Sequence, residues 1–272
     1  MNLRPVSLAL SVLSLAACTV SQDQETQIGQ DEAAKINAEL PLLRDDAVTG
    51  YLNALGKSIA GKTSRADLPW QFAVVNTDVV NAFALPGGFI YVNRGLIART
   101  HNESELAAVV SHEIEHVVRR HSIQQMEKAQ GANIGVSLAC RLTNICSHTT
   151  AQVAIEVGGA AMFARFGRAA EAEADSGGFQ NEVRAGLDPR GMLSFFTRLL
   201  AEEQHHNVML SWFADHPGTE DRIAEVQRLL AQLPPNASSG LRTDSPEFQA
   251  MKQQLAVLPA APPTPTAPPP SP

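Results

Sequence analysis

Three histidines and two glutamates lie close together in VVSHEIEHVVRRH, residues 109–121, although the whole chain has only eight histidines. His112, Glu113 and His116 form the pattern H-E-x-x-H. On a helix, two histidines four residues apart can bind one metal ion, and the glutamate after the first can reach a water molecule on that ion. The pattern predicts a metal site with a general base. The alternative, a charged and solvated helix face, is disfavoured because flanking valines would leave bare imidazoles without partners.

A catalytic zinc site takes three protein ligands and leaves one position for water. A metzincin would have its third histidine at residue 122 and glycine at 119, but the chain has Ser122 and Arg119 there. The segment RAAEAEADSGG offers a glutamate instead, since Glu171 and Asp175 are one helical turn apart. We expect Glu171 to bind the metal and Asp175 to accept a proton from the outer nitrogen of a ligand histidine. Glu173 is a rival ligand, and an exposed acidic face is the alternative for the whole segment.

The helix that carries the histidines has a recognisable start. Asn102 can cap it, and Glu105 three residues later approaches a capping box. Four apolar residues then form one face for the core: Leu106, Val110, Ile114 and Val117. His121 lies outside the H-E-x-x-H pattern, and we expect it at the surface.

Around this helix the sequence predicts a small sheet and several more helices. WQFAVVN and NAFALPGGFIYVN are rich in β-branched and aromatic residues, and Pro86-Gly87-Gly88 predicts a hairpin turn. We expect two or three short antiparallel strands there. Helices are predicted at 31–62 (one or two), 94–100, about 151–184, 189–203 and 220–232. Many helices after a small sheet predict an α+β fold, mainly helical, with a small antiparallel sheet.

Both ends of the chain differ from its body in composition. The start has Arg4 and then an apolar run from Val6 to Ala17, which is too short for the roughly 20 residues that span a bilayer and is typical of a secretory signal. A buried N-terminal helix is the alternative. The proline-rich end, LPAAPPTPTAPPPSP, predicts a solvated tail. The expected organisation is a signal at 1–17, a polar tether at 18–32, a folded domain at 33–258 and a tail at 259–272.

The balance of charges and the cysteines narrow the classes of function. The chain has 28 acidic and 21 basic residues, a net charge of −7, and no basic stripe, which argues against a nucleic-acid partner. Cys140 and Cys146, with five residues between them, predict a small-loop disulfide in an exported protein. A zinc site on these cysteines is the weaker alternative because the spacing matches no common zinc finger. The sequence has no G-x-S-x-G motif, so a serine hydrolase is not expected.

Four motifs occur in order over roughly residues 80–223: NAFALPGGFIYVNRGLI, SHEIEH, EAEAD and HPGTEDRI. Together they resemble the gluzincin metallopeptidases related to HtpX and the CAAX prenyl protease, although the chain lacks the membrane spans of those two proteins. The resemblance implies a zincin-like metalloprotease domain with one zinc ion per chain, bound by His112, His116 and Glu171. It implies that Glu113 acts as the general base of an endopeptidase. It also implies that substrate binds along an edge strand formed by Asn81, Ala82, Phe83 and Ala84.

The same resemblance assigns roles to two residues near the end of the matched span. Family members carry a histidine at the position of His216 that lies over the metal. His216 either stabilises the oxyanion of the transition state or occupies the fourth metal position in a self-inhibited resting enzyme, and we favour the second role. Arg222 either pairs with an acid to hold this loop or contacts the substrate.

The signal ends in LAAC, which resembles the lipobox of bacterial lipoproteins. This resemblance implies cleavage before Cys18, lipidation of its thiol and a membrane anchor, with ordinary secretion as the alternative. Thr19 in place of an aspartate implies sorting to the outer membrane, facing the periplasm. The sequence as a whole predicts a zinc-dependent endopeptidase that hydrolyses misfolded or misassembled envelope proteins. The rival function is a zinc-stabilised periplasmic chaperone or assembly scaffold without proteolysis.

Overall fold

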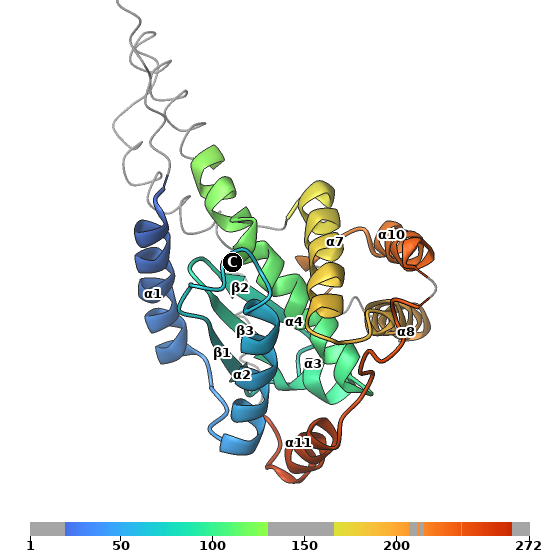
Figure 1. Ribbon diagram of the computed structural model, residues 1–272. Coiled ribbons are helices and arrows are strands. Elements are labelled where there is room, and N and C mark those ends of the chain that lie inside the picture. Colours follow the sequence, from blue (N-terminus) through green and yellow to red (C-terminus); the bar gives the residue numbers. More distant parts are fainter. Residues whose placement is uncertain (1–19, 130–165, 207–211, 213–214, 235, 263–272) are drawn as a thin grey trace, which may run out of the picture.

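The computed structural model describes residues 20–129, 166–206, 212, 215–234 and 236–262 (Figure 1). Its main elements, in chain order, are α1 (Gln22–Glu39), α2 (Asp46–Ala60), β1 (Gln71–Val75), β2 (Ala82–Leu85), β3 (Phe89–Asn93), α3 (Arg94–Arg99), α4 (Glu103–Val118), α7 (Arg168–Arg184), α8 (Arg190–His206), α10 (Thr219–Gln232) and α11 (Pro246–Val257). Residues 121–129 are also helical. The expected fold class, α+β and mainly helical, is confirmed.

The sheet has the strand order β1-β3-β2. β2 and β3 form the expected antiparallel hairpin, which closes where Gly87 and Gly88 adopt φ of 77° and 105°, a region that favours glycine. β1 pairs in parallel with β3, so the expectation of a wholly antiparallel sheet is wrong for this strand. The local pattern fixes the hairpin, but it does not determine on which side of the hairpin β1 pairs, because that choice depends on tertiary packing.

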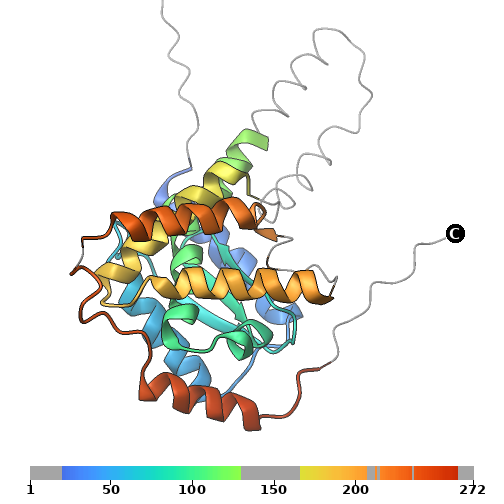
Figure 2. The ribbon, with the colours of Figure 1, turned by 90° about the vertical axis from the view of Figure 1, so that its right-hand side faces the viewer.

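The central strand β3 is buried on both faces, which explains its continuous apolar sequence. Phe89 and Tyr91 point to one face, where α1 packs, while Ile90 and Val92 point to the other, where α2 and α4 pack. Figure 1 shows α1 and α4 on opposite sides of the sheet. Beyond α4, helices α7, α8 and α10 add a further helical layer (Figure 2). The helix with the H-E-x-x-H pattern therefore lies at the centre of the molecule.

Helix α1 corrects the expected domain boundary. Residues 22–32, expected to form part of a polar tether, are helical, and Ser21 caps them in a capping box with Gln24. The polar composition concealed this helix, since its buried positions include a charge and a glycine. Glu25 is buried in ion pairs with two arginines, and a Cβ on Gly29 would lie 1.8 Å from the carbonyl oxygen of Pro86.

The remaining helices agree with the expected positions to within a few residues. α3, α8 and α10 correspond to the helices predicted at 94–100, 189–203 and 220–232, and α7 covers the second half of the stretch predicted at 151–184. The first part of that stretch lies outside the described residues, as do the signal, Cys18, Cys140 and Cys146. None of the described helices is long and apolar enough to cross a membrane.

Helix α11 was not predicted, although its sequence carries the usual signals. Ser245 caps it by accepting a hydrogen bond from the backbone N–H of Phe248, and Pro246 occupies the first turn. Phe248, Met251 and Leu255 are buried at helical spacing, and the helix packs against α2.

Candidate metal centre

Helix α4 positions His112, Glu113 and His116. As expected, Asn102 caps this helix by accepting a hydrogen bond from the N–H of Glu105 at 3.0 Å. The apolar face predicted at 106, 110, 114 and 117 is buried. His112 and His116 are also buried, and their Nε2 atoms lie 2.9 Å apart. The regular helix alone therefore brings two possible metal ligands together.

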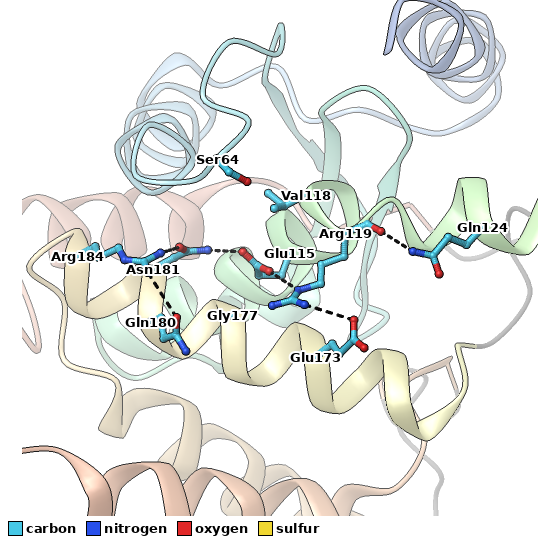
Figure 3. Close-up of a pocket in the computed structure, with 10 residues that line it drawn as sticks. All are labelled: Ser64, Glu115, Val118, Arg119, Gln124, Glu173, Gly177, Gln180, Asn181 and Arg184. Atoms are coloured by element: carbon cyan, nitrogen blue, oxygen red, sulfur yellow. Dashed lines mark hydrogen bonds and ion pairs between the residues drawn. The ribbon is translucent and has the colours of Figure 1, made fainter. Parts of the chain in front are cut away.

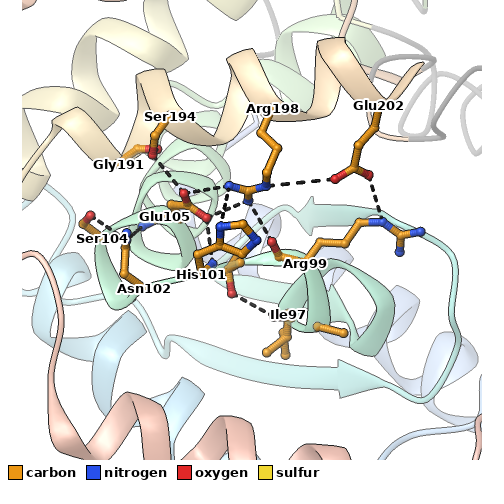
Figure 4. Close-up of polar contacts among 12 residues, drawn as sticks. Ile97, Arg99, His101, Asn102, Ser104, Glu105, Gly191, Ser194, Arg198 and Glu202 are labelled. Carbon is orange, nitrogen blue, oxygen red and sulfur yellow. Dashed lines mark hydrogen bonds and ion pairs between the residues drawn. The ribbon is translucent and has the colours of Figure 1, made fainter. Parts of the chain in front are cut away.

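The start of α4 is fixed by a separate polar cluster (Figure 4). Both carboxylate oxygens of Glu105 accept hydrogen bonds from Arg198 of α8, at 2.8 and 2.6 Å. Ser194 donates to one of these oxygens and the backbone N–H of His101 donates to the other. Because the bidentate pair joins α4 to α8, it holds the helix that carries the histidines in place.

Helix α7 brings Glu171 and Asp175 to α4. Two glycines directly after this pair allow a close approach. A Cβ on Gly178 would lie 3.1 Å from the backbone nitrogen of His112, and a Cβ on Gly177 would lie 2.2 Å from the Glu115 carboxylate. The segment EAEADSGG thus supplies both the acidic side chains and the small residues that let the two helices touch.

Four possible ligand atoms converge between α4, α7 and the loop before α10. His112, His116, Glu171 and His216 each offer one such atom, and these atoms lie within 4.8 Å of one another. Nε2 of His112 lies 3.4 Å from Glu171 Oε2 and 3.2 Å from His216 Nδ1, while Nε2 of His116 lies 3.7 Å from Glu171 Oε1. All four side chains are buried.

These separations fit a tetrahedral metal site. Ligand atoms about 2.0–2.1 Å from a zinc ion in tetrahedral geometry are roughly 3.3 Å from one another. The values observed among His112, His116 and Glu171, from 2.9 to 3.7 Å, bracket that distance, and with His216 included all four atoms lie within 4.8 Å of one another. Imidazole nitrogen and carboxylate oxygen are also the ligand types found in catalytic zinc sites. The donor set therefore fits zinc in both chemistry and spacing.

Asp175 and Arg222 orient His112 from its outer side. Nδ1 of His112 lies 2.8 Å from Asp175 Oδ1, which leaves Nε2 facing the other ligand atoms. Arg222 donates two hydrogen bonds of 2.7 Å to the same carboxylate. Burial alone would raise the pKa of Asp175, but the Arg222 guanidinium and these hydrogen bonds outweigh it and lower that pKa. Asp175 consequently stays ionised and accepts the Nδ1 proton of His112.

Glu171 is held as a carboxylate by the same principle. Burial opposes ionisation, but contacts with His112 and His216 lower the pKa of Glu171 well below its usual range. Arg222 adds a further positive charge at 3.3 Å. An ionised carboxylate in this position is suited to a cation.

Glu113 faces the cluster without belonging to the donor set. It is 1% exposed, and its Oε1 has no hydrogen-bond partner among the described residues. This oxygen lies 3.5 Å from Nε2 of His216. Burial is the main cause that raises the pKa of Glu113. A buried carboxylate with a raised pKa beside possible metal ligands is typical of a group that exchanges a proton.

The loop of His216 is tied to the sheet. Trp212 stacks on the His216 ring with 4.1 Å between centroids, and the backbone N–H of Trp212 donates to the carbonyl of Val80. The side chain of Asn81 donates to Asp215 at 2.8 Å. These contacts hold His216 over the histidines of α4.

Comparisons with known proteins agree with this geometry. Residues 46–230, which include all four converging side chains, match the model of peptidase family M48. The chain belongs to peptidase family M48. This membership confirms the resemblance to gluzincin metallopeptidases and the expected enzyme class.

Three relatives illustrate the extent of the similarity. The chain is 31% identical over 231 residues to the beta-barrel assembly-enhancing protease of Yersinia pestis, covering 82% of this chain and 47% of that protein. It is 28% identical over 241 residues to the mitochondrial metalloendopeptidase OMA1 of Schizosaccharomyces pombe, covering 86% and 70%. It is 29% identical over 180 residues to the metalloprotease LoiP of Escherichia coli K12, covering 66% and 68%. The chain thus spans slightly less than half the length of the first relative.

The segment expected to bind substrate is the outer strand of the sheet in this M48 protein. Asn81 precedes β2, and Ala82, Phe83 and Ala84 lie in it. β2 pairs with β3 on one side, and among the described residues no strand pairs with its other edge. β2 also packs against α4, which carries the possible ligands.

The contacts of Arg222 match one of the two roles expected for it. It is 4% exposed, it is paired with Asp175, and it lies 3.4 Å from the carbonyl oxygen of His216. Such a side chain holds the His216 loop, while its contact with substrate stays a prediction.

Two further side chains were singled out in the sequence, and only His121 differs from its expected position. Glu173, the rival ligand, has a half-exposed side chain that faces Arg119 rather than the cluster. His121, expected at the surface, is 4% exposed, and its Nδ1 lies 2.9 Å from Nδ1 of His116. On a regular helix, a spacing of five residues would not predict a contact between His121 and His116. Instead, the chain turns between them at Arg120, whose φ is 59°.

Proposed function

We propose that this protein is a zinc-dependent endopeptidase of the bacterial cell envelope. One observation carries the proposal: His112, His116 and Glu171 offer three ligand atoms at zinc-like spacing, and beside them lies the buried carboxylate of Glu113, whose Oε1 has no hydrogen-bond partner among the described residues. A purely structural zinc site has no need of such a base. The arrangement therefore favours hydrolysis over the rival chaperone or scaffold.

Zinc bound to these three residues would supply a Lewis acid and a water molecule whose pKa is lowered to about 7. Glu113 takes a proton from the attacking water and later passes it to the leaving amine. Asp175, itself held by Arg222, keeps the proton of His112 on Nδ1 and so keeps Nε2 free to bind. The chain's own contribution is thus a fixed donor set and a buried base.

The open edge of β2 supports an extended polypeptide as substrate. A peptide that adds to this edge would be bound by backbone hydrogen bonds, which do not depend on sequence. Unfolded and misassembled proteins expose such segments. The name of the Yersinia pestis relative, a beta-barrel assembly-enhancing protease, supports envelope proteins as the substrate class.

We place the protein at the periplasmic face of the outer membrane, anchored through a lipid on Cys18. The apolar run and LAAC of the first 18 residues support export and lipidation. If α1 starts at Gln22 in the mature protein, the anchor would be only a few residues away from the folded domain.

His216 is proposed to act as a plug in the resting enzyme. Its Nδ1 lies 3.2 Å from His112 Nε2 and 3.2 Å from Glu171 Oε2, the position of a fourth ligand in a tetrahedral set. A histidine there competes with water, so substrate cleavage requires this loop to move. The alternative role, a donor to the oxyanion, requires the same residue to turn toward the substrate.

The direct test is cleavage of unfolded casein by the purified protein. We expect cleavage with zinc, none after treatment with a chelator, and recovery when zinc is added back. A chaperone or scaffold would bind casein and leave it intact under all three conditions.

A further inference from the structure

The outer nitrogens of the two α4 histidines have different partners. Nδ1 of His112 faces a carboxylate, that of Asp175, at 2.8 Å. Nδ1 of His116 instead faces another imidazole, Nδ1 of His121, at 2.9 Å. Both His116 and His121 are buried, and the ring of Phe166 stacks on His116 with 4.1 Å between centroids. Water therefore has little access to this contact.

Only one proton fits between two nitrogens at this distance, and the donor set determines its position. His116 must carry it on Nδ1, because a proton on Nε2 would block that atom from binding a metal. Nδ1 of His121 is then the acceptor, so a neutral His121 carries its own proton on Nε2. That nitrogen makes no hydrogen bond among the described residues, but it lies 3.5 Å from a carboxylate oxygen of Glu173, within ion-pair distance. The three side chains thus form a directed series from Glu173 through His121 to His116.

We propose that His121 and Glu173 are positioning residues that fix the metal-binding tautomer of His116. This inference rests on the proposed metal centre and adds residues that the H-E-x-x-H pattern does not contain. His121 does for His116 what Asp175 does for His112. Glu173, the rival ligand at the sequence level, acts two side chains away from the donor set.

The turn that follows α4 is built to place His121. Arg119 ends the helix, and Arg120 adopts a left-handed conformation that is costly for a residue with a side chain. Arg120 donates to the buried carboxylate of Glu25 in α1 at 2.7 Å. Arg65 bridges the same carboxylate and the carbonyl of Val117, at 2.8 and 2.9 Å. These contacts from α1 stabilise the turn that returns His121 toward His116.

Glu173 is held from the opposite side, in a polar groove between α4 and α7 (Figure 3). Figure 3 shows Arg119 between Glu115 and Glu173, with contacts of 3.1 and 3.4 Å. Arg119 thereby keeps Glu173 near His121, although the glutamate side chain is 53% exposed. Because water can replace a half-exposed carboxylate, Glu173 should matter less than His121.

Zinc affinity, measured by competition with a chelator of known affinity, tests the proposal without relying on proteolysis. His121→Leu removes the acceptor, and we expect a loss of roughly 10- to 100-fold in affinity, as for other outer partners of metal ligands. Glu173→Ala should lose less. Glu202→Ala is the matched control. Glu202 is also a partly exposed glutamate that pairs with an arginine, Arg99, but it does not contact the cluster of possible ligands. Its affinity should equal that of the wild type.

A pair of amide variants separates positioning from packing. His121→Asn puts an acceptor oxygen near the position of Nδ1, whereas His121→Gln puts it near that of Nε2. We expect the Asn variant to bind zinc more tightly than the Gln variant, and both to melt alike in the presence of chelator. Equal zinc affinities for these two variants, or a His121→Leu variant that folds and binds like the wild type, would overturn the proposal. A wild type that binds no zinc would instead refute the proposed metal centre.

Discussion

The two ends of α4 carry buried polar clusters of opposite character. At its start, Glu105 receives four hydrogen bonds, from Arg198 twice, Ser194 and the His101 backbone, so both of its carboxylate oxygens are paired with protein donors (Figure 4). Farther along, nitrogens and carboxylate oxygens that are all potential ligands face one another within 4.8 Å. The Glu105 carboxylate is satisfied by protein donors alone, whereas the atoms of the second cluster could all bind one shared cation. Burial of polar groups therefore indicates a metal site only where acceptors outnumber donors.

The largest effect should come from removing a ligand. Glu171→Ala is expected to lose both bound zinc and casein cleavage, because only two ligands outside the His216 loop would remain. Glu173→Ala should retain most of its zinc, measured by mass spectrometry of the native protein. If Glu173→Ala loses zinc completely and Glu171→Ala does not, the assignment of ligands on α7 is wrong.

Substitutions in the cluster at the start of α4 should lower the stability of the protein without changing its zinc content. Arg198→Met leaves the buried Glu105 carboxylate without its main partner and should lower the free energy of unfolding by about 3 kcal/mol. Zinc per folded chain should not change. Arg228→Met serves as the control, because Arg228 pairs with Glu225 on the exposed side of α10 and should contribute at most ~0.5 kcal/mol. Denaturant unfolding of both variants makes the comparison, and equal losses would contradict it.

His216→Ala distinguishes the two roles proposed for that residue. Removal of a plug should raise the basal rate of casein cleavage, whereas removal of an oxyanion donor should lower turnover on the order of 100-fold. We expect the rise, because His216 already lies 3.2 Å from both His112 and Glu171. A hundredfold fall would leave only the oxyanion role.

The smallest effect should be a change in acid sensitivity. Burial opposes ionisation of Glu105, but hydrogen bonds from Arg198 outweigh it and lower its pKa in the folded state. A lowered pKa contributes stability above the ordinary pKa of glutamate, and this contribution is lost as the pH falls through the folded value. With chelator present, Glu105→Gln should therefore show a flatter decline of stability below about pH 4.3 than the wild type. If the stability of both proteins declined equally as the pH falls, the pair of Glu105 and Arg198 would not contribute to acid sensitivity.

Features defined by short-range spacing could be predicted from the sequence. Three such features each depend on residues a few positions apart: the pattern H-E-x-x-H, the spacing of Glu171 and Asp175 by one helical turn, and the hairpin at 86–88. Asn102 as a cap belongs to the same group. Because helical and turn periodicities are local, such residues come together without knowledge of the tertiary fold.

Features that depend on partners far apart in the sequence could not be predicted. Helix α1 is stabilised by Glu25, whose partners Arg65 and Arg120 are 40 and 95 residues away. His121 reaches His116 only because this ion pair holds a left-handed turn at Arg120. The parallel pairing of β1 likewise depends on which strand the folded sheet places beside it. In the first two cases a charged or polar sequence concealed a buried contact.

Activity and zinc content of Glu113→Gln, measured together, test the central claim most directly. Glu115→Gln is the matched control, since Glu115 is also buried on α4 but contacts Arg119 and Asn181, away from the donor set. We expect Glu113→Gln to lose casein cleavage, by at least about 100-fold as for other general bases, while both variants keep about one zinc ion per chain. Full cleavage by Glu113→Gln with zinc in place would contradict it.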